Sequence, residues 1–119
     1  TIGQEKYKSM TKIFFKNSKI VLYVYDVTKR ETFDSLKNWK NTIDEILGDV
    51  PTVGVVANKC DLYLEEQVKE NEGKQYADEI GAKFIYTSAK LDAINFKAFI
   101  EEMVKEYVNK FEIKKNNEL

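Results

Sequence analysis

Histidine is absent from the 119-residue sequence, which also has only one cysteine, one proline and five glycines. Without histidine, the chain lacks the commonest general base and the commonest metal ligand, which excludes Ser/His/Asp and Cys/His triads and histidine-containing zinc sites. The single cysteine, Cys60, can form neither an internal disulfide nor a thiolate cluster. A chain with a single unpaired cysteine suits a reducing compartment, and the cytosol is the default. Chemistry in this chain must depend on carboxylates, amides, lysines or the backbone.

Excess charge and long apolar runs are also missing. The 19 basic and 20 acidic residues leave a net charge of −1, so nucleic acid and acidic membranes are not expected partners. The longest apolar run, residues 20–25, is far shorter than the roughly 20 residues that cross a bilayer. With 43% hydrophobic residues the chain can still bury a core, and its length suits one small domain.

Three short apolar runs predict β-strands. They lie at residues 20–25, 53–57 and 84–86, and helical patterns separate them. Such alternation is typical of an α/β domain with mainly parallel strands flanked by helices. The first run is apolar throughout, so we expect that strand to be covered on both faces.

Period-3.6 patterns predict the helices. Residues 33–47 form one helix that stops near Gly48, and Thr28 with Glu31 fits a capping box at its start. A shorter helix ends at Gly81, a suitable left-handed position. The last helix carries an apolar stripe that we expect in the core: Phe96, Phe99, Ile100, Met103, Val104, Tyr107, Val108 and Phe111. Residues 5–16 also fit a helix. We predict a domain over residues 1–111 and a polar tail, 112–119, that frays at its end.

Polar residues follow the second and third predicted strands directly. They read Asn58-Lys59-Cys60-Asp61 and Thr87-Ser88-Ala89-Lys90. Ligands of open α/β sheets bind outside the carboxyl ends of the strands, where both loops lie. The two oxygens of an ionised Asp61 match the adjacent N–H donors on the N1 and N2 edge of guanine, and the backbone amide of Ala89 can face a carbonyl oxygen such as O6. Lys59 and Lys90 have stems long enough to lie along a flat ring.

The alternative for each motif is a solvated turn, because an Asn-Lys-x-Asp tetrapeptide also arises by chance. The occurrence of both motifs, each directly after a predicted strand, favours a nucleotide-binding slot over two unrelated turns. Thr87 follows Asn58 by 29 residues, which is about one β/α unit.

At these residues the sequence resembles the Ras-like small GTPases, and specifically the Rab branch. The two loops resemble the guanine-specificity motif and its companion loop. Gly3-Gln4-Glu5 resembles the start of switch II, residues 6–15 are similar to Rab switch II, and residues 22–28 are similar to the strand that follows it. The likeness covers residues 1–111 in order.

The resemblance implies roles for single residues. Gln4 would orient the water that attacks the γ-phosphate of GTP, and the amide of Gly3 would sense that phosphate. Asn58, Lys59 and Asp61 would hold guanine, Ser88 would support Asp61, and Ala89 with Lys90 would complete the pocket. The implied ligands are GTP or GDP with Mg²⁺.

The phosphate loop G-x-x-x-x-G-K-[ST] is absent from the sequence, and so are the family's two metal ligands, which would fall ahead of Thr1. We therefore expect a C-terminal portion of a small GTPase that does not hydrolyse GTP by itself. Without the family's first strand, the strand at 20–25 would have a free edge, which favours a dimer or a swapped assembly.

Two functions remain open at this point. The first is a Rab-type GTPase switch in vesicle trafficking, which meets effectors and regulators through switch II. The second is a nucleotide-independent protein-binding module that uses residues 6–16 and 32–47. The resemblance implies a cytoplasmic protein on the cytosolic face of endomembranes, held there only by a lipid anchor that this sequence does not contain.

Overall fold

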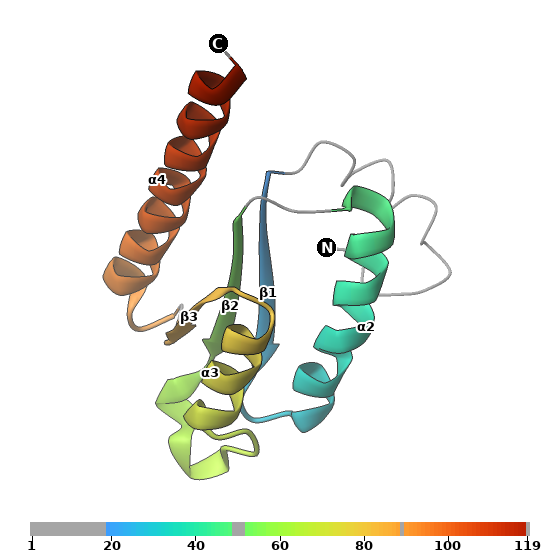
Figure 1. Cartoon of the computed structure of the whole chain (residues 1–119). Helices are drawn as coiled ribbons and strands as arrows, with labels where there is room; N and C mark the ends of the chain where they lie inside the picture. The colour runs from blue at the N-terminus through green and yellow to red at the C-terminus, as the bar shows by residue number, and fades with distance from the viewer. Residues whose placement is uncertain (1–18, 49–51, 89, 119) are drawn as a thin grey trace.

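The structure is a computed structural model that describes residues 19–48, 52–88 and 90–118. It is an α/β fold in which helices flank a three-stranded parallel sheet (Figure 1). The elements in chain order are β1 (Ile20–Asp26), α2 (Arg30–Leu47), β2 (Thr52–Asn58), the 3₁₀ helix η2 (Cys60–Glu65), α3 (Glu70–Glu79), β3 (Lys83–Tyr86) and α4 (Ala93–Glu118). The predicted fold class is confirmed, and each predicted strand lies within an observed one.

The strands lie in the order β1-β2-β3, and both pairings are parallel. Asp26 is in register with Asn58, and Ala57 with Tyr86. All three strands therefore end at the same edge of the sheet, where the two motif loops begin.

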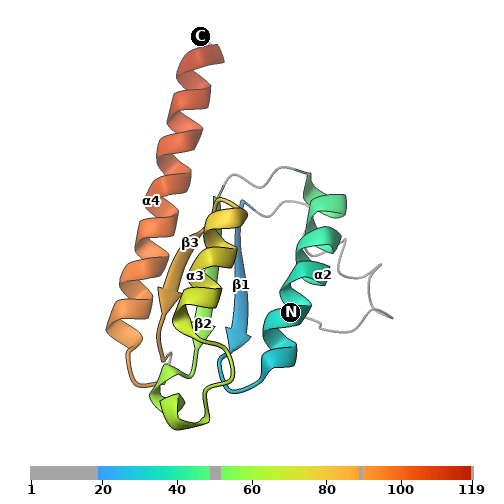
Figure 2. The ribbon, with the colours of Figure 1, turned by 60° about the horizontal axis from the view of Figure 1, so that its bottom comes forward.

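The two faces of the sheet are covered by different helices, α2 and α3 on one face and α4 on the other (Figure 2). Because side chains alternate along a strand, odd-numbered residues of β1 and β2 face α2 and α3, and even-numbered residues face α4. The first core contains Tyr23, Tyr25, Leu36, Ile43, Val55, Ala57, Tyr76 and Ala77. The second is smaller and contains Val56, Phe99 and Met103, with Leu22 and Ile85 beside them.

The prediction that the first strand is covered on both faces is wrong for β1. Val24, on the α4 face, keeps 52% of its surface exposed. A helix is about 10 Å wide and strands are about 4.8 Å apart, so one helix covers about two strands. Since α4 lies over β2 and β3 as well as part of β1, this face of β1 stays partly bare.

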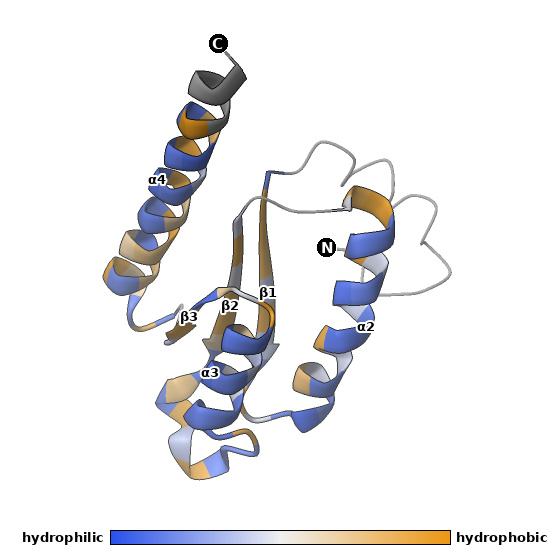
Figure 3. Cartoon of the chain, in the orientation of Figure 1, coloured by the Kyte–Doolittle hydropathy of each residue, from blue (hydrophilic) through white to orange (hydrophobic). Residues whose placement is uncertain are grey.

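The apolar stripe of α4 is only partly buried, which corrects the expectation that it lies in the core. Hydrophobic segments recur along α4 (Figure 3), but Phe99 and Met103 are buried, whereas Val104, Val108 and Phe111 are exposed. The reason is length, because a 26-residue helix is about 39 Å long and extends well past the sheet (Figure 2). The helix also continues through Glu118, so residues 112–118 of the predicted polar tail are helical.

The predicted capping box at the start of α2 does not form. The helix begins at Arg30 with Lys29 at the N-cap position, and no side chain caps it there. Asp26 Oδ1 instead accepts from Thr28 N over 2.9 Å and from the Thr28 hydroxyl over 2.6 Å, so the N–H that Glu31 would have capped already has a carboxylate partner. At the end of α3, Gly81 has φ of 70°, which confirms the predicted left-handed position.

Some predictions fall outside the described residues. These are the helix at residues 5–16, switch II, and the site residues Gly3, Gln4 and Ala89. Among the described residues, no helix is both long and apolar enough to span a membrane.

Candidate nucleotide site

The loops after β2 and β3 are joined by backbone hydrogen bonds. Thr87 N donates to Ala57 O over 2.8 Å and continues the ladder between the two strands. Cys60 N then donates to Thr87 O over 3.2 Å, which ties the first motif loop to the second. The predicted meeting of the two loops at one edge of the sheet is therefore observed.

Lys59 has an unusual backbone and a fixed side chain. Its φ of 67° puts it in the left-handed region, where residues other than glycine are uncommon. Its ammonium lies 2.7 Å from Asp26 Oδ2 at the end of β1. Burial acts to raise the pKa of Asp26, but hydrogen bonds from Lys59 and Thr28 prevail and lower it. The site residue Lys59 is thus anchored to a neighbouring strand.

The second motif loop is held by Ser88, which is buried. Its Oγ accepts from Leu91 N over 3.2 Å, and its backbone O accepts from Asp92 N over 2.7 Å. The support of Asp61 by Ser88 stays a prediction. Lys90 lies exposed in the turn before α4.

The thiol of Cys60 is partly buried and has acidic neighbours. Burial raises the pKa of the Cys60 thiol, and the charges of Asp61 and Asp92 raise it further. The thiol therefore stays protonated at neutral pH and is a poor nucleophile. Asp61 lies half-buried at this edge, and a carboxylate there can accept from N–H donors of a ligand.

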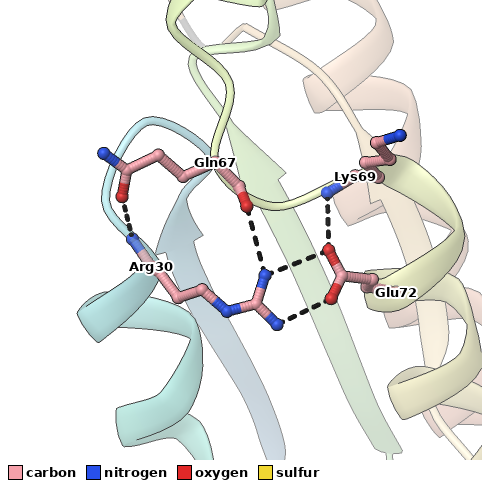
Figure 4. A network of polar contacts seen from close by, with 4 residues as sticks. All are labelled: Arg30, Gln67, Lys69 and Glu72. Carbon is pink, nitrogen blue, oxygen red and sulfur yellow. Dashed lines mark hydrogen bonds and ion pairs between the residues drawn. The ribbon is translucent and has the colours of Figure 1, made fainter.

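A network of polar contacts supports the segment between η2 and α3, at the end of the loop that follows β2 (Figure 4). Arg30 contacts both carboxylate oxygens of Glu72, at 2.6 Å and 3.2 Å, and also donates to Gln67 O. Gln67 Oε1 accepts from the first backbone N–H of α2, and Glu72 Oε2 accepts from Lys69 N. These contacts join the starts of α2 and α3 to the segment after η2.

Two further contacts fix the same segment against the sheet. Val27 O accepts from both Gln67 N and Val68 N, and the side chain of Val68 is fully buried. The hydroxyl of Tyr86, on β3, donates to Glu66 Oε2. The segment between β2 and α3 is thus anchored at both ends, by Cys60 N at its start and by residues 66–68 at its end.

Sequence reasoning missed Asp26 and the Arg30–Glu72 pair as supports of the site. Asp26 was detectable, because it ends a strand beside Asn58. The Arg30–Glu72 pair spans 42 residues, and no local pattern marks it.

The predicted site residues that the structure describes lie at this edge of the sheet: Asn58 ends β2, Lys59 and Asp61 follow it, and Ser88 and Lys90 follow β3. Among the described residues, no group of three acidic, cysteine or histidine side chains could hold a metal ion.

Comparison with known proteins agrees with this geometry. The model of the Ras family matches residues 1–109. The chain belongs to the Ras family. It is 41% identical over 102 residues to Ras-related protein Rab-22A of Mus musculus. These aligned residues are 85% of this chain and 52% of the relative. It is also 38% identical over 110 residues to Ras-related protein RIC1 of Oryza sativa subsp. japonica, covering 92% of this chain and 54% of the relative.

Further Rab relatives place this Ras-family chain in the Rab branch. Ras-related protein Rab-21 of Geodia cydonium is 39% identical over 90 residues, which is 76% of this chain and 39% of the relative. The chain spans about half the length of the curated relatives it matches. The predicted resemblance to small GTPases of the Rab branch is confirmed.

Proposed function

We propose that this Rab-branch chain supplies the guanine-recognising part of a GTP-binding domain. The observation that carries the proposal is the hydrogen bond from Cys60 N to Thr87 O, which holds the two motif loops at one edge of the sheet. Asp61 accepts from the N1 and N2 donors of guanine and repels adenine, whose N1 is itself an acceptor. Ser88 supports Asp61, and Asn58, Ala89 and Lys90 complete the pocket.

Lys59 lies along one face of the base in this proposal. Its ammonium is already bound to Asp26, so the aliphatic stem is fixed before a ligand arrives. A preformed stem reduces the conformational entropy that binding costs. The left-handed backbone of Lys59 fits this role, because strained conformations concentrate at ligand sites.

The remaining roles are also proposals. In the complete GTPase, Gln4 orients the attacking water and Gly3 contacts the γ-phosphate, whereas this chain alone does not hydrolyse GTP. We place the GTPase in the cytoplasm, on the cytosolic face of endomembranes, where a lipid anchor would hold it. It acts there as a switch in vesicle trafficking and meets effectors and regulators through switch II.

We further propose that the chain forms a dimer or a swapped assembly through the edge of β1. Among the described residues β1 pairs only with β2, so its other side offers unpaired backbone groups. The exposed side chain of Val24 adds apolar surface next to that edge.

The base preference can be tested with nucleosides, which carry no phosphate. We expect guanosine to bind weakly and to shift the backbone amide signals of Asn58, Asp61 and Ser88 in NMR titrations. Adenosine should leave these signals unmoved. Inosine, which lacks the N2 amino group, should bind more weakly than guanosine because Asp61 then receives one hydrogen bond instead of two.

The matched variants are Asp61→Asn and Asp92→Asn. Asp61→Asn should remove the preference for guanosine, and Asp92→Asn should keep it because Asp92 lies in the other loop, with its side chain accepting from Asn95. Equal shifts with adenosine and guanosine in the unaltered chain would refute the proposal. In a separate assay, chromatography after denaturation of the purified chain should reveal little or no GDP.

A further inference from the structure

A groove of about 610 Å³ lies between β3 and α4, and the proposed base site does not use it. Residues 84–87 form one wall. Asp92 and the first turns of α4 form the other, up to Lys105. Its volume is within the range of about 300–1,000 Å³ that ligand sites occupy.

β3 forms one wall of this groove and is the outermost strand on its side of the sheet, since in the described part of the chain it pairs only with β2. Thr87 N donates to β2, so Ile85, two residues earlier, also directs its backbone groups to β2. The backbone N–H and C=O groups of Phe84 and Tyr86 therefore point away from the sheet. An added strand can pair with them.

The α4 wall carries an excess of negative charge. Asp92, Glu101 and Glu102 line the groove, and Lys105, at its far end, is the one cation in the wall. Glu101 and Glu102 are exposed, and among the described residues neither forms an ion pair. Charge complementarity favours a cationic occupant.

Thr87 is an independent sign that the groove can accept a polar group. It lines the groove, has 1% of its surface exposed, and shares the α4-facing side of β3 with Ile85. Its Oγ1 is buried and has no hydrogen-bond partner. Buried hydroxyls normally have a partner, so Thr87 offers an extended ligand one more polar contact.

We propose that this groove binds an extended, lysine- or arginine-rich peptide segment of a partner protein as an added strand beside β3. The peptide backbone pairs with Phe84 and Tyr86. Side chains alternate along a strand, so every second residue faces α4, and cations at those positions meet Glu101 and Glu102. The proposal is independent of nucleotide binding.

The test uses the full chain and a fluorescent hexapeptide, acetyl-Lys-Val-Lys-Val-Lys-Val-amide. We expect saturable binding in fluorescence anisotropy that weakens as salt is added. Hydrogen exchange followed by NMR should show new protection at the amides of Phe84 and Tyr86. The block peptide Lys-Lys-Lys-Val-Val-Val and the alternating Glu-Val peptide should bind much more weakly.

Two double variants distinguish binding in the groove from a general effect of the chain's negative charge. Glu101→Gln with Glu102→Gln should weaken binding about three- to tenfold, because exposed ion pairs contribute modestly. Glu79→Gln with Glu112→Gln removes the same charge at exposed positions outside the groove and should leave binding unchanged.

The proposal is overturned if both double variants weaken binding equally, or if the protected amides lie on β1. It is also overturned if the block peptide binds as tightly as the alternating one. Protection of Phe84 and Tyr86 in the chain alone, together with a dimer in sedimentation, would assign this edge to a second copy instead.

Discussion

The carboxylate of Asp26 binds the ammonium of Lys59 at 2.7 Å and joins the end of β1 to the loop after β2. Asp26 Oδ1 also accepts from the backbone N and the hydroxyl of Thr28. One partly buried carboxylate therefore supports both the turn into α2 and a proposed base-contact residue.

We predict that Asp26→Ala destabilises the chain more than Lys59→Ala. Removal of Asp26 leaves the partly buried Thr28 N–H without its acceptor, which costs about 1–3 kcal/mol of unfolding free energy. Lys59→Ala removes an ion pair whose lysine side chain is about half exposed, and Asp26 keeps both of its hydrogen bonds from Thr28. Urea denaturation of both variants measures the order, and the reverse order would show that Thr28 finds another partner.

Gly73→Ala should destabilise the chain although alanine is the better helix former. A Cβ at Gly73 would overlap the Tyr25 hydroxyl and approach Phe84 to 2.7 Å. Overpacking of this kind costs about 1–3 kcal/mol, which exceeds the helix-propensity gain of about 1 kcal/mol. Gln75→Ala, at an exposed position of the same helix, is the control and should change stability little. A thermal melt in which Gly73→Ala matches the unaltered chain would contradict the close packing of α3 on β1.

The two halves of α4 should respond differently to truncation. Met103 is fully buried under the sheet, and Met103→Ala should cost about 2–5 kcal/mol. Val108 keeps 42% of its surface exposed, and Val108→Ala should stay within about 0.5 kcal/mol. Chemical denaturation can compare the two, and similar losses would mean that the distal half is covered in solution.

Glu72 gives the chain a defined response to acid. The hydrogen bonds from Arg30, then that from Lys69 N, lower the pKa of Glu72 from 4.5 to about 2. A carboxyl whose pKa falls on folding stabilises the fold above its unfolded value, and this contribution is lost as pH falls from 4.5 toward about 2.

The stability difference between the unaltered chain and Glu72→Gln should therefore shrink on acidification. Urea midpoints measured in steps between about pH 7 and about pH 2.5 follow this change. Glu70→Gln, at an exposed position in the first turn of the same helix, serves as the control. A difference that stays constant across this range would show that the Arg30–Glu72 contact does not form in solution.

Association through β1 should depend on the exposed face of that strand. Val24→Lys places a charge beside the edge, a substitution that opposes strand-to-strand pairing. We expect sedimentation velocity to show a dimer or larger assembly for the unaltered chain and a monomer for Val24→Lys. A well-folded monomer at high concentration without the substitution would rule out this assembly.

The three strands and the flanking helices could be predicted from the sequence because each has a strong local pattern. Strands 53–57 and 84–86 were predicted within residues that observed strands contain. The end of the helix before Gly81 could also be predicted from local backbone preference, since glycine adopts φ near 70° without strain. The two motif loops were identified for the same reason, as each is a short contiguous run at the end of a strand.

Tertiary structure decided what depends on distance through space. Periodicity marked the whole stripe of α4 as apolar, but only the sheet's dimensions determine that Met103 is buried and Val108 is not. Thr28 lost its predicted capping role to a contact with Asp26, because local signals do not rank competing acceptors. The Arg30–Glu72 bridge joins residues that are 42 positions apart, so it exists only once the sheet has formed. The groove lies between a strand and a helix that are neighbours in the sequence, but its shape depends on how α4 packs against β3.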